Sequence, residues 1–280
     1  MRILKYAATL LSAALLTSSC GEVAAPPQLT QHASSLGSIV NGTPTGGAYS
    51  NVGALLFDLN GNGVDGDDEW CTGSLIAPTV FLTAAHCIVT PYTPPGSQFY
   101  VSFAPDLFAK NAKFIAATGV VYDPAYGHDV ASLHDLALVF LPSGAAKGLT
   151  PLHLPRAGIL DHLSAKGQLS KTLFVNVGYG TSATRTGPPG FPFDGKRSMS
   201  KSEFMGLQPT WLGLLMNTSA TGEGGDCYGD SGGPKFIDGD ATTIYATVTT
   251  GDYPCRATTW DWRLDTPEAR GFLSKYVNLP

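Results

Sequence analysis

A histidine, an aspartate and a serine stand in three separate segments, with the types and order needed for covalent hydrolysis. His86 follows the run LTAA, Asp135 precedes LALV, and Ser231 lies within GDSGGP. A serine hydroxyl is a weak nucleophile at neutral pH until a base takes its proton. A neutral imidazole can take this proton and return it to a leaving amine, while a buried carboxylate fixes the imidazole's tautomer. The glycines around Ser231 would let the backbone N–H groups of Gly229 and Ser231 converge on the oxyanion. The three residues therefore predict amide hydrolysis.

The order of the three residues excludes one alternative. GDSGG around Ser231 also fits the G-x-S-x-G turn of α/β-hydrolases, in which the histidine follows the serine. All six histidines of this chain precede Ser231. His134 adjoins Asp135, but neighbouring residues of a strand point to opposite faces. We therefore expect His134 to be structural.

With these motifs the chain resembles the trypsin- and chymotrypsin-like serine proteases, from residue 39 to the C-terminal end. Ile39 opens the run IVNG, similar to the new N-terminus of an activated protease; CTGSLI and VGYG are similar to strands of the two barrels. The resemblance implies an all-β fold of two packed six-stranded antiparallel β-barrels with a C-terminal α-helix. It also implies an endopeptidase that acts on polypeptides and needs no cofactor for catalysis. We expect a monomer.

Two hypotheses in which the protein has no catalytic activity stay open. The first is a catalytically dead homologue that serves as a binding module. The second is a lipid-anchored surface protein in which the barrel is only a scaffold. Serine-directed labelling and a Ser231→Ala variant distinguish both from an enzyme.

Further roles follow from the resemblance alone. It pairs Cys71 with Cys87 and Cys227 with Cys255, whereas the sequence by itself allows three pairings of these four cysteines. It also predicts that cleavage before Ile39 releases an α-ammonium that pairs with Asp230. Many zymogens carry Arg or Lys before this bond, but Ser38 stands here. Another protease with a preference for small residues, or slow self-cleavage, would then make the cut.

The resemblance also locates the substrate pocket. Gly225 falls at its base, so the carboxylate of trypsin is absent at that point. The neighbouring Asp226 could present a charge to a basic side chain, or it could be turned away and bonded locally. The residues expected at the wall and entrance, the first three also pairing with the substrate backbone, are Thr249, Thr250, Gly251 and Tyr228.

An acidic segment before the first cysteine of the domain fits the twelve-residue calcium-loop pattern D-x-[DN]-x-[DN]-G-x₅-E. Its oxygen ligands would stabilise the domain around one Ca²⁺. The alternative is an acidic, solvated hairpin tip, since the flanks look like strands. The expected ligands are Asp58, Asn60, Asn62, the Val64 carbonyl and Glu69.

The elements that must position these residues are short. Charged residues make up 14% of the 280 residues, while 33 Gly and 20 Pro favour brief strands and many turns. We expect a helix that begins after Thr266, with Pro267 at its first position, and runs to about Val277. A net charge of −5 without a basic run argues against nucleic acid as a partner. The β-like runs are Val52–Phe57, Val80–Thr83, Phe99–Phe103, Leu136–Leu141, Leu173–Val177 and Thr243–Thr250.

The N-terminus reads as a targeting region. Residues 1–20 form a signal peptide with a positive start and an apolar run too short for a membrane span. Residues 21–38 are a linker or pro-segment, and residues 39–280 are the protease domain. Cys20 resembles the lipid-bearing cysteine of bacterial lipoproteins; ordinary secretory cleavage is the alternative. We therefore predict a protein that is secreted, or anchored to the outer side of a bacterial membrane through Cys20 before processing.

Overall fold

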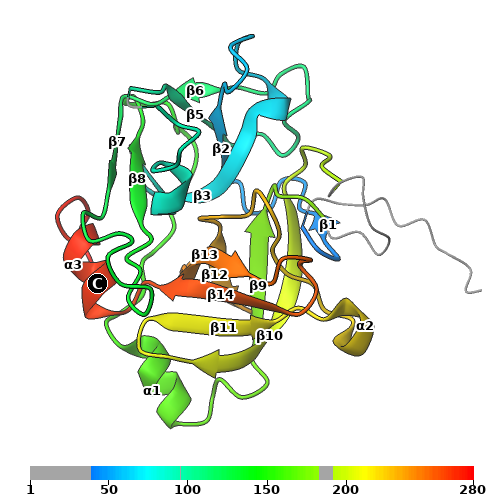
Figure 1. Ribbon diagram of the computed structural model, residues 1–280, viewed down its shortest axis with the longest axis vertical. Coiled ribbons are helices and arrows are strands. Elements are labelled where there is room, and N and C mark those ends of the chain that lie inside the picture. Colours follow the sequence, from blue (N-terminus) through cyan, green and yellow to red (C-terminus); the bar gives the residue numbers. More distant parts are fainter. Residues whose placement is uncertain (1–38, 95, 183–191) are drawn as a thin grey trace, which may run out of the picture. The chain divides into compact units, whose positions relative to one another are not determined.

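The computed structural model describes residues 39–94, 96–182 and 192–280. The predicted signal peptide, the linker and Cys20 lie outside these residues. Strands dominate the described chain, and its helices are few and short (Figure 1). In the described part no helix has the length and apolar character to cross a bilayer.

Six antiparallel strands close into a barrel in the C-terminal half. Each strand bonds to the next, and β9 pairs with both β10 and β12, which completes the ring. The short β1 (Thr43–Pro44) joins the side of β10. Around the barrel the strands are β9 (Leu173–Gly178), β10 (Ser198–Leu207), β11 (Trp211–Leu215), β14 (Thr258–Arg263), β13 (Ala246–Gly251) and β12 (Pro234–Ile237).

The N-terminal half forms a curled sheet of seven antiparallel strands. The expected all-β fold is confirmed. Its second barrel is a curled half-barrel rather than a closed one, because the edge strands β6 and β7 do not pair with each other in the described residues. β6 is only two residues long and offers few backbone groups for closure. The strand order is β6 (Ile115–Ala116), β5 (Phe99–Ser102), β2 (Val52–Phe57), β3 (Glu69–Ala77), β4 (Val80–Thr83), β8 (Ala137–Phe140) and β7 (Gly119–Tyr122).

The largest apolar cluster joins the curled sheet to the barrel. It contains Leu82 and Leu138 from the sheet together with Val177 and Trp262 from the barrel, all at most 1% exposed. Burial of each such side chain contributes roughly 1.5–3 kcal/mol. Smaller clusters fill the interior of the sheet and of the barrel. The two halves therefore share one core, and residues at their junction are held firmly.

Short helices complete the fold. α3 begins as predicted: the Thr266 hydroxyl accepts the N–H of Ala269, and Pro267 is its first residue, although the helix ends at Leu273. Its Phe272 and Leu273 pack into the shared core. The others are α1 (Ile159–Ala165), α2 (Thr218–Thr221) and the 3₁₀ turns η1 (Gly66–Asp68) and η2 (Ala85–Cys87).

Candidate active site

His86 lies in η2, directly after β4, and Asp135 fixes it by two hydrogen bonds. The backbone N–H of His86 donates to Asp135 Oδ1 at 2.9 Å, and His86 Nδ1 lies 2.7 Å from Asp135 Oδ2. Asp135 is fully buried, whereas the imidazole is 30% exposed. An ionised carboxylate can only accept, so Nδ1 carries the proton and Nε2 is the basic nitrogen. The ring is thus oriented to take a proton on its exposed side.

Ser231 lies in a turn that only glycines can form. Gly229 and Gly232, on either side, have φ values of 96° and 77°. A Cβ on Gly232 would come within 2.3 Å of the Thr83 hydroxyl. The turn is fastened to both halves of the molecule: the Ser231 carbonyl accepts the N–H of Thr72 in the sheet, and Gly232 donates to Val248 in the barrel. This explains why the sequence around the serine is rich in glycine.

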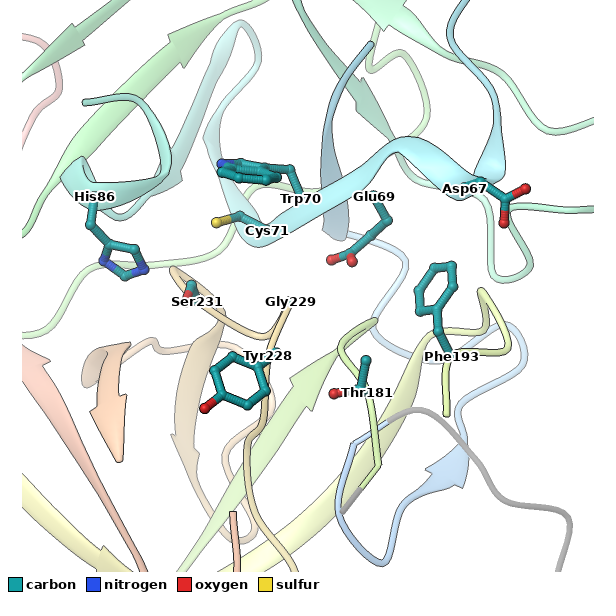
Figure 2. A pocket seen from close by; sticks show the side chains of 10 residues that line it. All are labelled: Asp67, Glu69, Trp70, Cys71, His86, Thr181, Phe193, Tyr228, Gly229 and Ser231. Carbon is teal, nitrogen blue, oxygen red and sulfur yellow. The ribbon is translucent and has the colours of Figure 1, made fainter. Parts of the chain in front are cut away.

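His86 and Ser231 line the same cavity of about 430 Å³ (Figure 2). One wall comes from the beginning of β3 and includes Glu69, Trp70 and Cys71, while the opposite wall includes Thr181 and Phe193. Tyr228 and Gly229 complete the lining. The structure thus brings the predicted base and nucleophile to one cavity.

Asp230 and Ile39, the two residues of the predicted activation pair, both bond to Gly180. Both are fully buried. The Ile39 N–H donates to the Gly180 carbonyl at 3.0 Å, and the Gly180 N–H donates to Asp230 Oδ1 at 2.9 Å. The Cys227 N–H donates to the other carboxylate oxygen. Burial and the nearby Asp226 raise the pKa of Asp230 well above its ordinary value, so this carboxyl would be stabilised by a cation.

At the predicted base of the pocket, Asp226 is not a free carboxylate. Asp226 forms a buried ion pair with Lys235, which also donates to Asn176 Oδ1 at 2.7 Å and lies 3.6 Å from Asp261. Burial outweighs the attraction of Lys235 and raises the pKa of Asp261 to about 8. Gly225 forms a two-way backbone bridge with Val40. Asp226 is therefore paired with Lys235 inside the protein, which is the second of the two alternatives considered for it.

The remaining pocket residues lie at β13 and at the cavity entrance. Thr250 lines a separate small groove of about 210 Å³ with Gln208, Trp211 and Trp260. Thr249 and Gly251 are the neighbours of Thr250 on β13. Tyr228 is 47% exposed and donates from its hydroxyl to the Tyr253 carbonyl.

Both predicted disulfides are confirmed. Cys71 bonds to Cys87 and thereby ties β3 to the turn that carries His86. Cys227 bonds to Cys255 and ties the segment before Ser231 to the loop after β13. Each bridge constrains one side of the cavity.

The acidic segment 58–69 does not gather all of its expected ligands in one turn. Asp58 accepts the N–H groups of Gly61 and Gly63, and the Asn60 side chain accepts the N–H of Asn62. Glu69, expected as the last ligand, instead lines the cavity of His86 and Ser231. Among the described residues the one cluster of three metal-binding side chains is Cys71, His86 and Cys87, whose sulfurs are already joined in a disulfide.

The calcium-loop pattern did not predict that Glu69 lies in the cavity of His86 and Ser231. A Cβ built on Gly229 would lie 2.7 Å from Glu69 Oε2, so this carboxylate packs directly against the turn before the nucleophile. Glu69 opens β3 two residues before Cys71. Its spacing from a cysteine that borders the histidine is the signal that could have placed it in the cavity.

The fold and the cavity define an all-β, chymotrypsin-like molecule with a closed six-stranded barrel, a curled sheet and a C-terminal helix. The family model described as Trypsin matches residues 57–260, and the chain belongs to this family. The family implies a serine endopeptidase that acts on polypeptides.

Solved structures agree with this fold. Human heparin binding protein is 17% identical, with a TM-score of 0.64 and coverage of 86% of this chain and 98% of that one. Neuropsin, a serine protease expressed in the limbic system of mouse brain, is 16% identical, with a TM-score of 0.62 and coverage of 86% and 100%. At these identities the likeness shows the fold.

Proposed function

We propose that the protein is a secreted serine endopeptidase in which Ser231 is the nucleophile, His86 the general base and Asp135 the residue that orients the imidazole. The observation that carries the proposal is the bond from His86 Nδ1 to buried Asp135, in a ring that shares one cavity with Ser231. This bond leaves Nε2 as the nitrogen that can accept a proton beside the serine.

The reaction then follows in two halves. Ser231 Oγ attacks the carbonyl carbon as His86 Nε2 takes its proton, and the N–H groups of Gly229 and Ser231 stabilise the oxyanion. The C–N bond breaks, His86 gives its proton to the leaving amine, and an acyl ester remains on Ser231. Water, deprotonated by His86, attacks this ester and releases the carboxylic acid and the free serine.

Serine-directed labelling tests this proposal. Protein that begins at Ile39 should react with a fluorophosphonate, and the Ser231→Ala variant should not. Ser274→Ala, at an exposed serine after α3, is the matched control and should label normally. Absence of labelling in the parent protein would favour a catalytically dead homologue, and labelling of Ser231→Ala would assign the wrong nucleophile.

Cleavage between Ser38 and Ile39 is the proposed activation step. The buried Ile39 nitrogen already lies at Gly180, which also binds Asp230. Cleavage would turn this nitrogen into an ammonium beside a buried carboxylate, and the resulting pair would stabilise the turn of Gly229 and Ser231. N-terminal sequencing of active protein should give Ile39, and any other start would contradict the proposal.

Export and anchoring are proposed for the N-terminal segment. The two disulfides and the family favour an extracellular location. If Cys20 carries a lipid, cleavage before Ile39 frees the domain from the membrane, since the four other cysteines are paired with one another. Mass spectrometry of the precursor should find a lipid on Cys20; an unmodified or absent Cys20 would restrict the protein to simple secretion.

Preference before the scissile bond is proposed to be other than basic. Lys235 neutralises Asp226, so the pocket base offers no uncompensated charge at that residue. A peptide panel with Arg, Phe, Leu and Ala at this position should show no advantage for Arg. A clear Arg preference would mean that Asp226 or Asp261 reaches the substrate despite Lys235.

Calcium binding by Asp58, Asn60, Asn62 and the Val64 carbonyl stays a proposal from the sequence. If the ion stabilises this turn, a chelator should lower the melting temperature. An unchanged melting temperature would leave an acidic turn held by its own hydrogen bonds.

A further inference from the structure

Glu69 holds a carboxylate in the cavity of His86 and Ser231, and no residue that the structure describes forms an ion pair with it. Its Oε1 atom is buried and has no hydrogen-bond partner among the described residues. The carboxylate lies against Gly229, and Figure 2 shows it pointing from β3 into the cavity, toward Gly229. A buried carboxylate oxygen that lacks a donor is costly, and a ligand that supplies a donor would offset this cost.

The walls around Glu69 fit a cation. Asp67 adds a second carboxylate to the lining, and Trp70, Phe193 and Tyr228 supply aromatic surface. Neither Lys nor Arg is among the described residues of this lining. Burial and the nearby Asp230 raise the pKa of Glu69 well above its ordinary value, which is the effect of removing a carboxylate from water without a counter-charge. Arginine and lysine side chains carry the missing charge, and both can also pack on aromatic rings.

The position of this wall indicates which part of a substrate reaches it. Thr249, Thr250 and Gly251 of β13, expected at the wall of the pocket and to pair with the substrate backbone, do not line this cavity. Glu69 and Trp70 lie on the other half of the molecule, next to the disulfide that borders His86. The acyl part is bonded to Ser231, and His86 delivers a proton to the departing amine. The Glu69 wall therefore faces the peptide that departs.

We propose, resting on the peptidase function above, that Glu69, assisted by Asp67 and the aromatic walls, binds an arginine or lysine side chain within the first two residues after the scissile bond. The carboxylate accepts hydrogen bonds from the guanidinium or ammonium group. The protein then selects substrates by the leaving peptide, where its own charge is uncompensated, rather than by the pocket base, where Lys235 has neutralised Asp226.

Peptides with one constant acyl part test the proposal on protein that begins at Ile39. The first and second residues after the scissile bond are varied in turn among Arg, Lys, Gln and Glu, and kcat/KM is measured for each. At one of the two positions Arg or Lys should exceed Gln by about tenfold or more, the effect of one charge-assisted hydrogen bond in a partly buried site. Glu should be the poorest residue there.

Three variants test which residue causes the preference for Arg or Lys. Glu69→Gln should bring the Arg-to-Gln ratio close to one, and Asp67→Asn should lower it by a smaller factor. Glu268→Gln makes the same chemical change in α3, outside the cavity, and should leave the ratio unchanged. Hydrolysis of an acyl anilide, which has no residue after the scissile bond, reports whether each variant is folded and active.

The outcomes separate this inference from the proposed function. Loss of both anilide hydrolysis and fluorophosphonate labelling in the parent protein would overturn the peptidase proposal itself. An active parent protein with an Arg-to-Gln ratio near one at both positions would overturn only the cation site. A parent preference for Arg that persists in an active Glu69→Gln protein would overturn the assignment to Glu69. Because the parent ratio needs no variant, the inference is testable even if Glu69→Gln does not fold.

Discussion

Two histidines of this molecule make the same hydrogen bond but have different surroundings. His86 Nδ1 lies 2.7 Å from Asp135, and His134 Nδ1 lies 2.9 Å from Asp123. The His86 ring lines the cavity of Ser231, whereas the His134 ring lies against Trp262, with centroids 5.6 Å apart. Of these two histidines, His86 alone lines the cavity of Ser231, as its proposed role as general base requires.

Replacement of the two aspartates should separate these roles. Asp135→Asn should lower kcat by a factor of about 10⁴, because an amide can stabilise the wrong tautomer of His86. Asp123→Asn makes the identical change at the other pair and should cost some stability but less than about tenfold in kcat. Steady-state kinetics and thermal melts of both variants give the comparison. Equal losses of kcat would mean that His134 takes part in the reaction.

Asp261 should make the protein less stable in alkali. Its pKa is raised from 3.8 to about 8 by burial in the folded protein, so the folded state holds this proton more tightly than the unfolded state. Its contribution is complete below pH 3.8 and is lost as the pH rises through about 8. As the pH rises to about 8, the melting temperature of the parent protein should therefore fall more than that of Asp261→Asn. Asp129→Asn, in an exposed loop, should follow the parent protein; a parallel course for Asp261→Asn would contradict the assignment.

Among the elements, β3 contributes most to the site. Glu69, Trp70 and Cys71 at its beginning line the cavity, and Thr72 donates to the carbonyl of Ser231. Its disulfide reaches η2, the turn of His86. One strand thus connects the histidine, the serine and the proposed cation site.

Removal of the β3 disulfide should affect both stability and catalysis. The Cys71→Ala, Cys87→Ala double variant opens a loop with a sequence separation of 16 residues, which corresponds to a loss of about 3 kcal/mol. The melting temperature should fall by roughly 6–12 °C. kcat should fall as well, because the turn of His86 loses its covalent support. If kcat/KM were unchanged at a temperature where the variant stays folded, the bridge would be purely a stabilising one.

Local signals in the sequence were enough to predict several elements. Val52–Phe57 and Val80–Thr83 match β2 and β4 at both ends, and Thr266 caps α3 as its side chain predicts. These segments carry their information in adjacent residues: apolar runs, turn residues and a capping hydroxyl. The disulfide pairing was predictable only through the family resemblance, since four cysteines allow three pairings.

Features that depend on distant pairing could not be predicted in the same way. Closure of a sheet depends on whether edge strands meet, and the two-residue β6 gave no signal of an open edge. Lys235 is adjacent to the predicted motif, yet nothing in the sequence shows that it folds back onto Asp226 and loses contact with water. Glu69 fitted a local calcium pattern, but the register of β3 directs its carboxylate to the cavity.

At the scale of the whole molecule, one buried arginine joins the two halves. Arg197 is 1% exposed and precedes β10 of the barrel. Its guanidinium donates to the carbonyl of Val52 in β2, to that of Phe103 directly after β5, and to the Tyr179 hydroxyl beside the barrel. It also donates to Thr45 Oγ and to the Gly46 carbonyl, in the segment that follows Ile39. The five bonds use the fixed, planar fork of the guanidinium.

A lysine at this position should weaken the union of the halves. Lys has three donors around a single nitrogen and cannot reach all of these acceptors, so Arg197→Lys leaves several buried acceptors unpaired. Each such group costs about 1–3 kcal/mol, and a loss of about 2 kcal/mol or more should lower the melting temperature by at least roughly 4–8 °C. Arg156→Lys, at an exposed arginine, is the matched control and should melt like the parent protein.

Because Arg197 holds the segment that follows Ile39, Arg197→Lys should also become more susceptible to proteolysis between residues 40 and 50. Unchanged melting and proteolysis would show that the apolar core alone holds the two halves together.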